Sequence, residues 1–343
     1  QKEINMNKLR KIGVSALAGA LVSFSATAAE WNISGQAGIT MSNSDEGNSA
    51  SAFSQDDTIT ISASGQTENG INVSATFKLE DGQTYDEHNV SFGTDSLGTL
   101  TFHGHGGSVV MGQFDDITPK AYEEVWDAID GTSSTSTDAS SARINGVGEQ
   151  NNIFTYQSPS IQGLTFRAAY ATAATGASTS IGNDTADSYS DYMDWGVSFA
   201  PEMVDGLTVY YAQGTRDTNV SATTESDEHT IGLVYTYGPI TVGYQESEED
   251  KSGVATDNEL EQYSIAYAVT DDLTVSYGER EYDHDTSATG NNKETQKESG
   301  VGISYTMGGV SIGGSFNSAD NVGGSTAATA DVDSYEINLS FAF

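Results

Sequence analysis

Apolar and polar residues alternate one by one along most of the chain. In residues 71–80 the apolar residues occupy the odd positions and the polar or charged residues occupy the even ones. Because successive side chains of a β-strand point to opposite faces, this pattern predicts a strand with one apolar and one polar face. The alternation returns in the segments 164–170, 207–211, 231–237, 263–269, 273–277, 301–307 and 335–343.

The connections between the predicted strands alternate in length. Short connections fall at 65–70, 94–98, 158–163, 201–206, 238–239, 270–272 and 307–309. Long connections fall at roughly 42–57, 81–88, 104–151, 175–190, 217–228, 246–259, 283–298 and 318–333. Tight turns at one end and long loops at the other are typical of a transmembrane up-and-down β-barrel, whose sheet must close because lipid satisfies no backbone group. We therefore predict an all-β antiparallel barrel of 16 strands, with both chain ends on the periplasmic side.

The first 29 residues depart from this pattern. Lys8, Arg10 and Lys11 precede a short run of apolar and small residues that ends in Ala26–Ala29. This order is typical of a secretory signal peptide, and the apolar run is shorter than the ~20 residues that span a bilayer. We predict a signal peptide in residues 1–29, with residues 1–5 as extra sequence upstream of Met6, and a barrel domain in residues 30–343.

The chain is strongly acidic, with a formal charge of −36. Without residues 1–29 it keeps nine basic and 48 acidic residues, a formal charge of −39. Nucleic-acid binding needs a basic surface, so a nucleic-acid partner is excluded. Two interpretations of the charge remain, a solvated acidic surface or a cavity that attracts cations. The absence of Cys excludes disulfides and thiolate metal sites.

The connection 104–151 is much longer than the others. Loops of this length in a compact protein usually carry a function or are disordered. Residues 119–129 are predicted to form a short helix, with Pro119 in its first turn. The segment is either another solvated outer loop or, as we expect, a loop folded into the barrel that narrows the pore. Its candidate constriction residues are the acids Asp115, Asp116, Glu123, Glu124, Asp127 and Asp130.

Four basic residues are the expected counterpart of these acids. Lys78, Arg167, Arg216 and Arg280 lie on predicted strands or strand ends, in phase with the polar face. A 16-strand barrel encloses water, so these side chains should point into the lumen and stay hydrated. If they face the loop acids across the lumen, the transverse field disfavours apolar solutes. Alternatively, each base only neutralises acids beside it.

Other chemical signals are weaker. His103 and His105 have a spacing that can hold a metal, but the sequence shows no third ligand. Asp115 and Asp116 are candidate ligands for Ca²⁺, and no other cofactor is expected. The run Glu246–Asp250 is expected to be a solvated loop or to share divalent cations with lipopolysaccharide. No spacing singles out a catalytic triad, so we predict no enzyme.

Several short motifs resemble the Gram-negative general porins. They are the start of the predicted barrel domain at residues 30–35, the segments 97–102 and 143–171, and the terminal Phe343. The resemblance covers residues 30–343 and implies a trimer of 16-stranded barrels in the outer membrane, with the third loop folded inward. It also implies that Phe343 is an assembly signal. The family's constrictions often carry a denser Arg and Lys cluster than this sequence offers.

These observations together predict a function. We expect a water-filled outer-membrane channel for passive diffusion of small hydrophilic solutes and ions, with a preference for cations. The alternatives are a substrate-specific channel, a barrel enzyme and a soluble secreted β-protein. The expected partners are two further copies of the chain, outer-membrane lipid and lipopolysaccharide. Small residues at outward positions, such as Ala37, Ala63 and Gly314, favour close packing between barrels.

Overall fold

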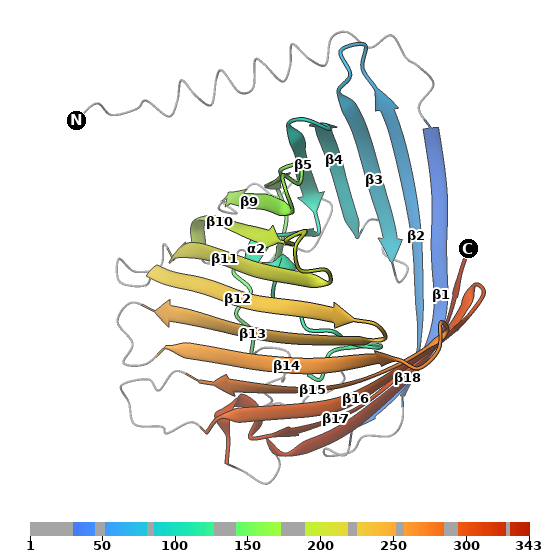
Figure 1. The fold of residues 1–343 in the computed structure, drawn as a ribbon, viewed down its shortest axis with the longest axis vertical. Coiled ribbons are helices and arrows are strands. Elements are labelled where there is room, and N and C mark those ends of the chain that lie inside the picture. The colour runs from blue at the N-terminus through green and yellow to red at the C-terminus, as the bar shows by residue number, and fades with distance from the viewer. Residues whose placement is uncertain are drawn as a thin grey trace.

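Sixteen antiparallel strands close into one barrel, in which β1 is hydrogen-bonded to both β2 and β18 (Figure 1). The computed structural model describes residues 30–44, 52–80, 86–126, 142–172, 189–218, 225–251, 257–284, 294–326 and 330–343. The predicted signal peptide, residues 1–29, lies outside the described residues. The strand number and the closure confirm the prediction from the sequence.

The first half of the barrel sheet is formed by β1 (Glu30–Ser44), β2 (Ala52–Gln66), β3 (Asn72–Glu80), β4 (Glu87–Thr94), β5 (Gly98–His105), β8 (Ile153–Gln157), β9 (Leu164–Thr172) and β10 (Tyr189–Phe199). The second half is formed by β11 (Leu207–Thr218), β12 (Glu225–Tyr237), β13 (Ile240–Lys251), β14 (Asn258–Ala268), β15 (Leu273–Asp283), β16 (Gln296–Met307), β17 (Val310–Asp320) and β18 (Val332–Ala342). The pair β6 (Gly107–Ser108) and β7 (Glu149–Gln150) forms a separate small sheet.

Apolar side chains cover the outside of the barrel. The outward residues of β1, for example Trp31, Ile33 and Ile39, are exposed, and so are Leu233 and Ile265 on the opposite side. The residues that alternate with them along each strand, such as Ser34 on β1 and Gln262 on β14, face the interior. A soluble barrel would bury its apolar face, so this inverted arrangement is that of a barrel surrounded by lipid.

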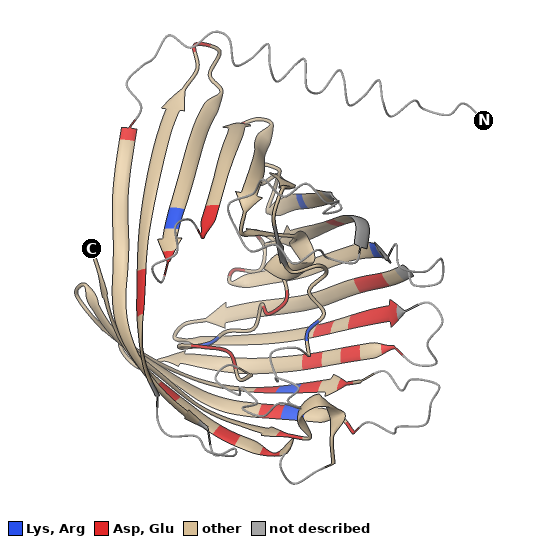
Figure 2. Cartoon of the chain, turned by 180° about the vertical axis from the view of Figure 1, so that it is seen from behind, with Lys and Arg blue, Asp and Glu red and all other residues tan. Residues whose placement is uncertain are grey.

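Several strands extend past the apolar band. The acidic run Glu246–Asp250 lies within β13, so its prediction as a loop is wrong. Glu246 and Glu248 point outward, and the hydroxyl of Tyr244 donates to Glu246 Oε2 at 3.3 Å. On β15 the Tyr277 hydroxyl donates in the same way to Glu279 Oε1 at 2.6 Å. Figure 2 shows the acids gathered toward one end of β12–β15. Because tyrosines favour the membrane interface, this level marks the edge of the apolar band.

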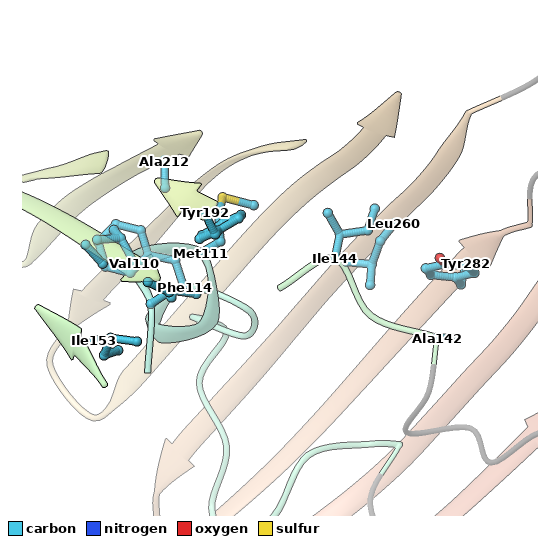
Figure 3. Close-up of a cluster of buried hydrophobic side chains, with 13 residues drawn as sticks. Val110, Met111, Phe114, Ala142, Ile144, Ile153, Tyr192, Ala212, Leu260 and Tyr282 are labelled. Carbon is cyan, nitrogen blue, oxygen red and sulfur yellow. The ribbon is translucent and has the colours of Figure 1, made fainter. Parts of the chain in front are cut away.

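A small hydrophobic core lies inside the barrel, between its wall and the connection from β5 to β8 (Figure 3). We call this connection, residues 106–152, the inner loop. Val110, Met111 and Phe114 of the loop are buried beside Tyr192 of the wall, and Ile144, further along the loop, is buried beside Leu260. Inward positions of a water-filled barrel are usually polar, so these apolar residues mark the part of the wall that the loop covers.

Among the described residues of the inner loop, α2 (Val110–Gln113) is helical. The predicted helix at 119–129 is wrong for its described part, because residues 119–126 form bends and turns. Backbone donors and acceptors of this segment form hydrogen bonds with side chains of the barrel wall instead of with each other in a helix. Within the described part of the chain, no helix is long and apolar enough to cross a membrane.

Candidate functional site

The inner loop crosses the interior of the barrel from β10 to β18. Near its start, the Met111 N–H donates to Asp194 Oδ2 on β10 at 2.7 Å. Further along, the Ala121 N–H donates to Ser276 Oγ on β15 at 2.9 Å. At the far side, the Tyr122 hydroxyl donates to Glu336 Oε1 on β18 at 2.5 Å. The loop is therefore folded inward and narrows the space that remains beside β1–β5.

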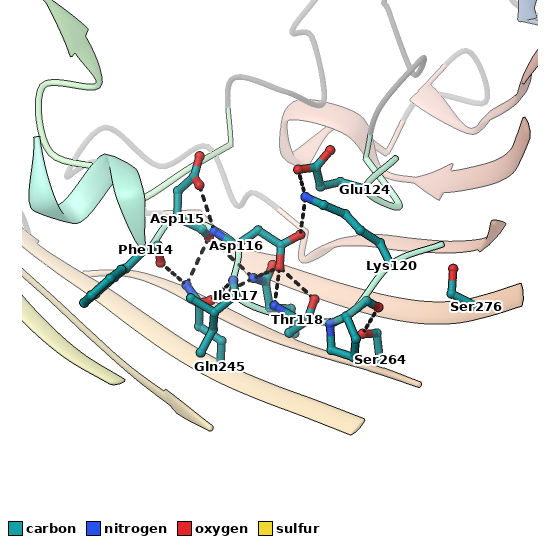
Figure 4. A network of polar contacts seen from close by, with 12 residues as sticks. Phe114, Asp115, Asp116, Ile117, Thr118, Lys120, Glu124, Gln245, Ser264 and Ser276 are labelled. Atoms are coloured by element: carbon teal, nitrogen blue, oxygen red, sulfur yellow. Dashed lines mark hydrogen bonds and ion pairs between the residues drawn. The ribbon is translucent and has the colours of Figure 1, made fainter. Parts of the chain in front are cut away.

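Gln245 holds the middle of the crossing (Figure 4). Its side chain on β13 is fully buried, and its Nε2 donates to the carbonyls of Phe114 at 2.8 Å and Asp115 at 3.0 Å. Its Oε1 accepts the N–H of Ile117 at 2.9 Å. One neutral amide thus satisfies three backbone groups of the loop, each of which would be costly to bury without a partner.

The return limb of the inner loop is held by charged residues. The Gly146 N–H donates to Glu228 Oε2 on β12 at 2.6 Å, and the Arg280 guanidinium donates to the carbonyl of Ala142. Arg143 on the loop lies over the ring of Trp126, with its guanidinium carbon 3.8 Å from the ring centroid. This distance is typical of a cation–π contact, which links the outgoing limb to the return limb.

The predicted loop acids Asp115 and Asp116 lie at the crossing. Asp116 Oδ1 accepts the N–H and the hydroxyl of Thr118 at 2.8 and 2.7 Å, and the Nε2 of Gln262 at 2.9 Å. Burial raises the pKa of both carboxyls, although Arg143 near Asp115 and Lys120 near Asp116 oppose the shift. Both acids therefore lose their charge at a higher pH than an exposed Asp.

Lys120 pairs with Glu124 and lies 4.0 Å from Asp116. Burial alone would lower the pKa of Lys120, but Asp116 and Glu124 outweigh it and raise that pKa. Burial alone would raise the pKa of Glu124, but Lys120 outweighs it and lowers that pKa. Glu123 is partly exposed beside them. The other predicted loop acids, Asp127 and Asp130, lie outside the described residues.

The three predicted arginines lie on the covered wall, behind the inner loop. Arg216 on β11 is 2.7 Å from Glu249, and Arg280 on β15 is fully buried and 3.0 Å from Glu298. Arg167 on β9 donates to Gln157 and Ser198. For Arg216 and Arg280 the structure therefore shows the alternative, pairing with a neighbouring acid, rather than a position across the lumen from the loop acids. Arg216 and Arg280 each pair with a carboxylate of the same wall, because an unpaired buried charge is costly, and Arg280 also reaches the loop carbonyl of Ala142.

Lys78 lies on the opposite, uncovered wall, β1–β5. Its Nζ is 2.6 Å from Glu87, 2.8 Å from Glu80 and 3.8 Å from Asp86. It is the only Lys or Arg among the described residues of these five strands. Asp56 faces the lumen from β2, next to the inward pair Thr58 and Glu80. Carboxylates therefore outnumber bases on the uncovered wall as well as on the loop.

The candidate metal ligands are not assembled into a site. Among the described residues, the one group of three acidic or histidine side chains close enough to share an ion is Glu80, Asp86 and Glu87. Lys78 already pairs with all three. His103 and His105 belong to no such group, and neither do the proposed Ca²⁺ ligands Asp115 and Asp116.

The sequence prediction missed the residues that position the inner loop. Gln245, Asp194 and Glu228 occupy inward positions of regular strands, and nothing local distinguishes them from other polar inward residues. A usable signal was the set of apolar inward residues on the same strands, such as Tyr192 and Leu260. In a water-filled barrel these residues require a cover.

Comparisons with known proteins agree with the geometry. A family model described as Gram-negative porin matches residues 13–324. Among solved structures, an anion-selective porin from Comamonas acidovorans has a TM-score of 0.68 at 12% identity, covering 92% of this chain and all of that one. OmpF of Salmonella typhi, in complex with daunomycin, has a TM-score of 0.67 at 11% identity, covering 92% of this chain and 98% of that one.

A third structure, OmpT of Vibrio cholerae in a trimer form, has a TM-score of 0.65 at 12% identity, covering 92% of this chain and all of that one. No curated protein sequence matches. At these identities the likeness to the solved structures shows a shared fold alone.

Proposed function

Because the chain belongs to the Gram-negative porin family, and is thus an outer-membrane channel for diffusion, we propose that it passes small hydrophilic solutes and ions with a preference for cations. The observation that carries the preference is the charge on both sides of the opening. The inner loop presents Glu123 and Glu124, and the uncovered wall presents Asp56, Glu80 and Glu87. Arg216 and Arg280, which would oppose them, are paired with Glu249 and Glu298 behind the loop.

The position of these acids matters more than the total charge of the chain. At about 0.15 M salt, the field of a charge decays over ~8 Å. Carboxylates on the outer surface are therefore screened from an ion inside the pore, whereas acids at the narrowest passage are not. This argument favours cation preference even though the anion-selective porin from Comamonas acidovorans has a similar fold. Selectivity follows the side chains at the passage, which the fold does not specify.

We extend the proposal to targeting, assembly and partners. Residues 1–29 direct export as a signal peptide, and the terminal Phe343 directs barrel assembly. Three copies form a trimer, in which small outward residues such as Ala37, Ala63 and Gly314 let barrels pack closely. Support comes from the trimer form of the similar Vibrio cholerae protein. The exposed outer surface contacts outer-membrane lipid, and the outward acids of β13–β15 face lipopolysaccharide. We propose no enzymatic activity.

Reversal potentials in planar bilayers under a KCl gradient test the proposal. Replacing Glu123 and Glu124 by Gln should reduce cation preference strongly at moderate salt, since it also releases Lys120 from its ion pair with Glu124. Replacing the outward acids Glu246 and Glu248 by Gln is the matched control and should change little. Anion preference of the unsubstituted channel, or a larger effect of the control, would contradict the proposal. Saturation of the current by one solute would indicate a substrate-specific channel instead.

A further inference from the structure

Glycines line the covered wall where the inner loop crosses it. Six inward positions, on β10, β12, β13, β15, β16 and β17, are glycine, and a Cβ atom at each would lie within 4 Å of a loop atom. We call this set the glycine seat. Its members are Gly196, Gly232, Gly243, Gly278, Gly302 and Gly313.

The order of the loop residues follows the order of the strands. Val110 lies over the glycine of β10, Ile117 over that of β12, Pro119 over that of β13 and Tyr122 over those of β16 and β17. The chain then turns back, and Val125 lies over the glycine of β15. Glycine weakens a strand interior and commonly marks a close approach of another backbone. Here loop backbone atoms lie over Gly243 and Gly302, and loop side chains lie over the other four glycines.

Among the six glycines, the backbone of the loop comes closest at Gly243. A Cβ atom there would overlap Pro119 Cδ and lie 3.1 Å from Thr118 Cα and 3.4 Å from Pro119 N. The three nearest atoms all belong to the loop, and two of them are backbone atoms, which cannot move aside by a rotamer change. Restoring ordinary carbon–carbon contact would require the loop to move by about 1 Å.

The loop can move in only one direction, away from the barrel wall. The loop is packed between the wall and the lumen, so added volume on the wall displaces it toward the lumen. Its tethers next to Gly243 are side chains, since Ser264 Oγ donates to the Pro119 carbonyl at 2.5 Å and Gln245 binds Ile117. Side-chain tethers can follow a shift of about 1 Å by changing rotamer, so the loop moves without detaching.

We propose that the glycine seat determines how far the inner loop stands from the wall, and hence the width of the channel. This inference rests on the proposed channel function and adds width-determining residues to it. None of the six glycines touches a passing solute, because the loop covers them. They act by positioning the loop.

The test measures single-channel conductance and the rate of liposome swelling with sugars of increasing size. For an opening on the order of 10 Å wide, a loss of about 1 Å removes roughly a tenth of the width. Gly243→Ala should therefore lower conductance roughly 1.1-fold and Gly243→Val roughly 1.3-fold, with a larger loss for the largest sugars that still pass. Gly313→Ala, beneath the Tyr122 ring, should act in the same direction.

Two further variants separate displacement from a general defect. Gly38→Ala adds the same methyl group on the inner face of β1, where its nearest neighbour would be Asn338 Nδ2 at 3.3 Å and no loop atom is near. It should leave conductance unchanged. Adding Pro119→Ala to Gly243→Ala removes the overlapping Cδ atom, although Thr118 Cα stays close, and should restore most of the lost conductance. Folding of each variant is checked by its heat-dependent migration in gels.

The possible outcomes distinguish failure of this inference from failure of the proposed channel function. If the unsubstituted protein forms no pores, the proposed function fails. If it forms pores, and the folded Gly243 and Gly313 variants conduct as well as or better than it, the inference fails alone. Failure of Pro119→Ala to restore conductance would also overturn it. If Gly243→Val does not fold, the two alanine variants still decide.

Discussion

Lys78 offers the sharpest test of how the lumen selects ions. It is the only Lys or Arg among the described residues of the uncovered wall, and it neutralises part of the charge of Glu80, Asp86 and Glu87. Replacing it with Gln keeps a polar side chain of similar length and makes the wall more negative by one unit. We expect a stronger preference for cations.

The magnitude follows from Coulomb's law. For an ion about 8 Å away, one unit charge contributes roughly 0.5 kcal/mol at the dielectric constant of water and roughly 2 kcal/mol at an effective value of about 20. At about 0.15 M salt, screening reduces this energy to about a third, or roughly 0.2 to 0.8 kcal/mol. The local cation concentration should therefore rise roughly 1.4- to 4-fold. At about 1 M salt, where the Debye length is ~3 Å, the effect should almost vanish.

The assay is the reversal potential under a KCl gradient, measured at low and high mean salt. Lys297→Gln is the matched control, because Lys297 also pairs with a carboxylate, Glu281 at 2.7 Å, but points outward from β16. It makes the same change in net charge and should leave selectivity unaltered. The reasoning is refuted if Lys78→Gln has no effect, if it favours anions, or if its effect is independent of salt.

Three other perturbations probe the charge, the tether and the closure of the barrel. Because burial raises the pKa of Asp115 and Asp116, cation preference should decline as the pH falls, before exposed carboxylates are protonated. Reversal potentials across a pH series check this, and a preference that rises in acid contradicts it. Gln245→Ala leaves buried backbone groups of the loop without hydrogen-bond partners, at a cost of about 1–3 kcal/mol each, so the noise of the open-channel current should rise. Gln296 is equally buried but is bonded to Glu298 and Gly323, so Gln296→Ala should leave the noise unchanged. Deleting Phe343 removes two backbone hydrogen bonds to Gly35 and should lower the amount of assembled protein, measured by surface labelling, whereas Phe343→Tyr should not lower it. Equal labelling after the deletion would count against a role of Phe343 in assembly.

The strands could be predicted wherever the outward residues are apolar. Where β13 leaves the apolar band, the outward residues become Glu246 and Glu248, and a search for apolar residues ends the strand too early. The inward residues Gln245 and Ser247 continue the alternation without interruption. The strand end was therefore present in the sequence, but on the face that carries no hydrophobic signal.

The roles of the arginines could not be predicted in the same way. Alternation correctly places Arg216 and Arg280 on inward faces, but it does not say which part of the wall the loop covers. That choice depends on contacts such as those of Met111 with Asp194 and Ile117 with Gln245, which join residues 83 and 128 positions apart. Local pattern contains no information at that separation, whereas the apolar Leu260 and Tyr282 on inward faces do indicate a covered wall.

The pairing of β1 with β18 also constrains when the molecule can form. Gln36 is the register partner of Ala342, so the first strand has no final neighbour until the last residues of the chain have been made. Closure joins segments about as distant as the chain allows, and contacts of this kind make folding slow. The closed barrel can therefore form only after β18 has been synthesised. A sequence that alternates polar and apolar residues suits that delay, because a strand of this kind lacks the continuous apolar run that would place it in a bilayer as a helix before its partner strands exist.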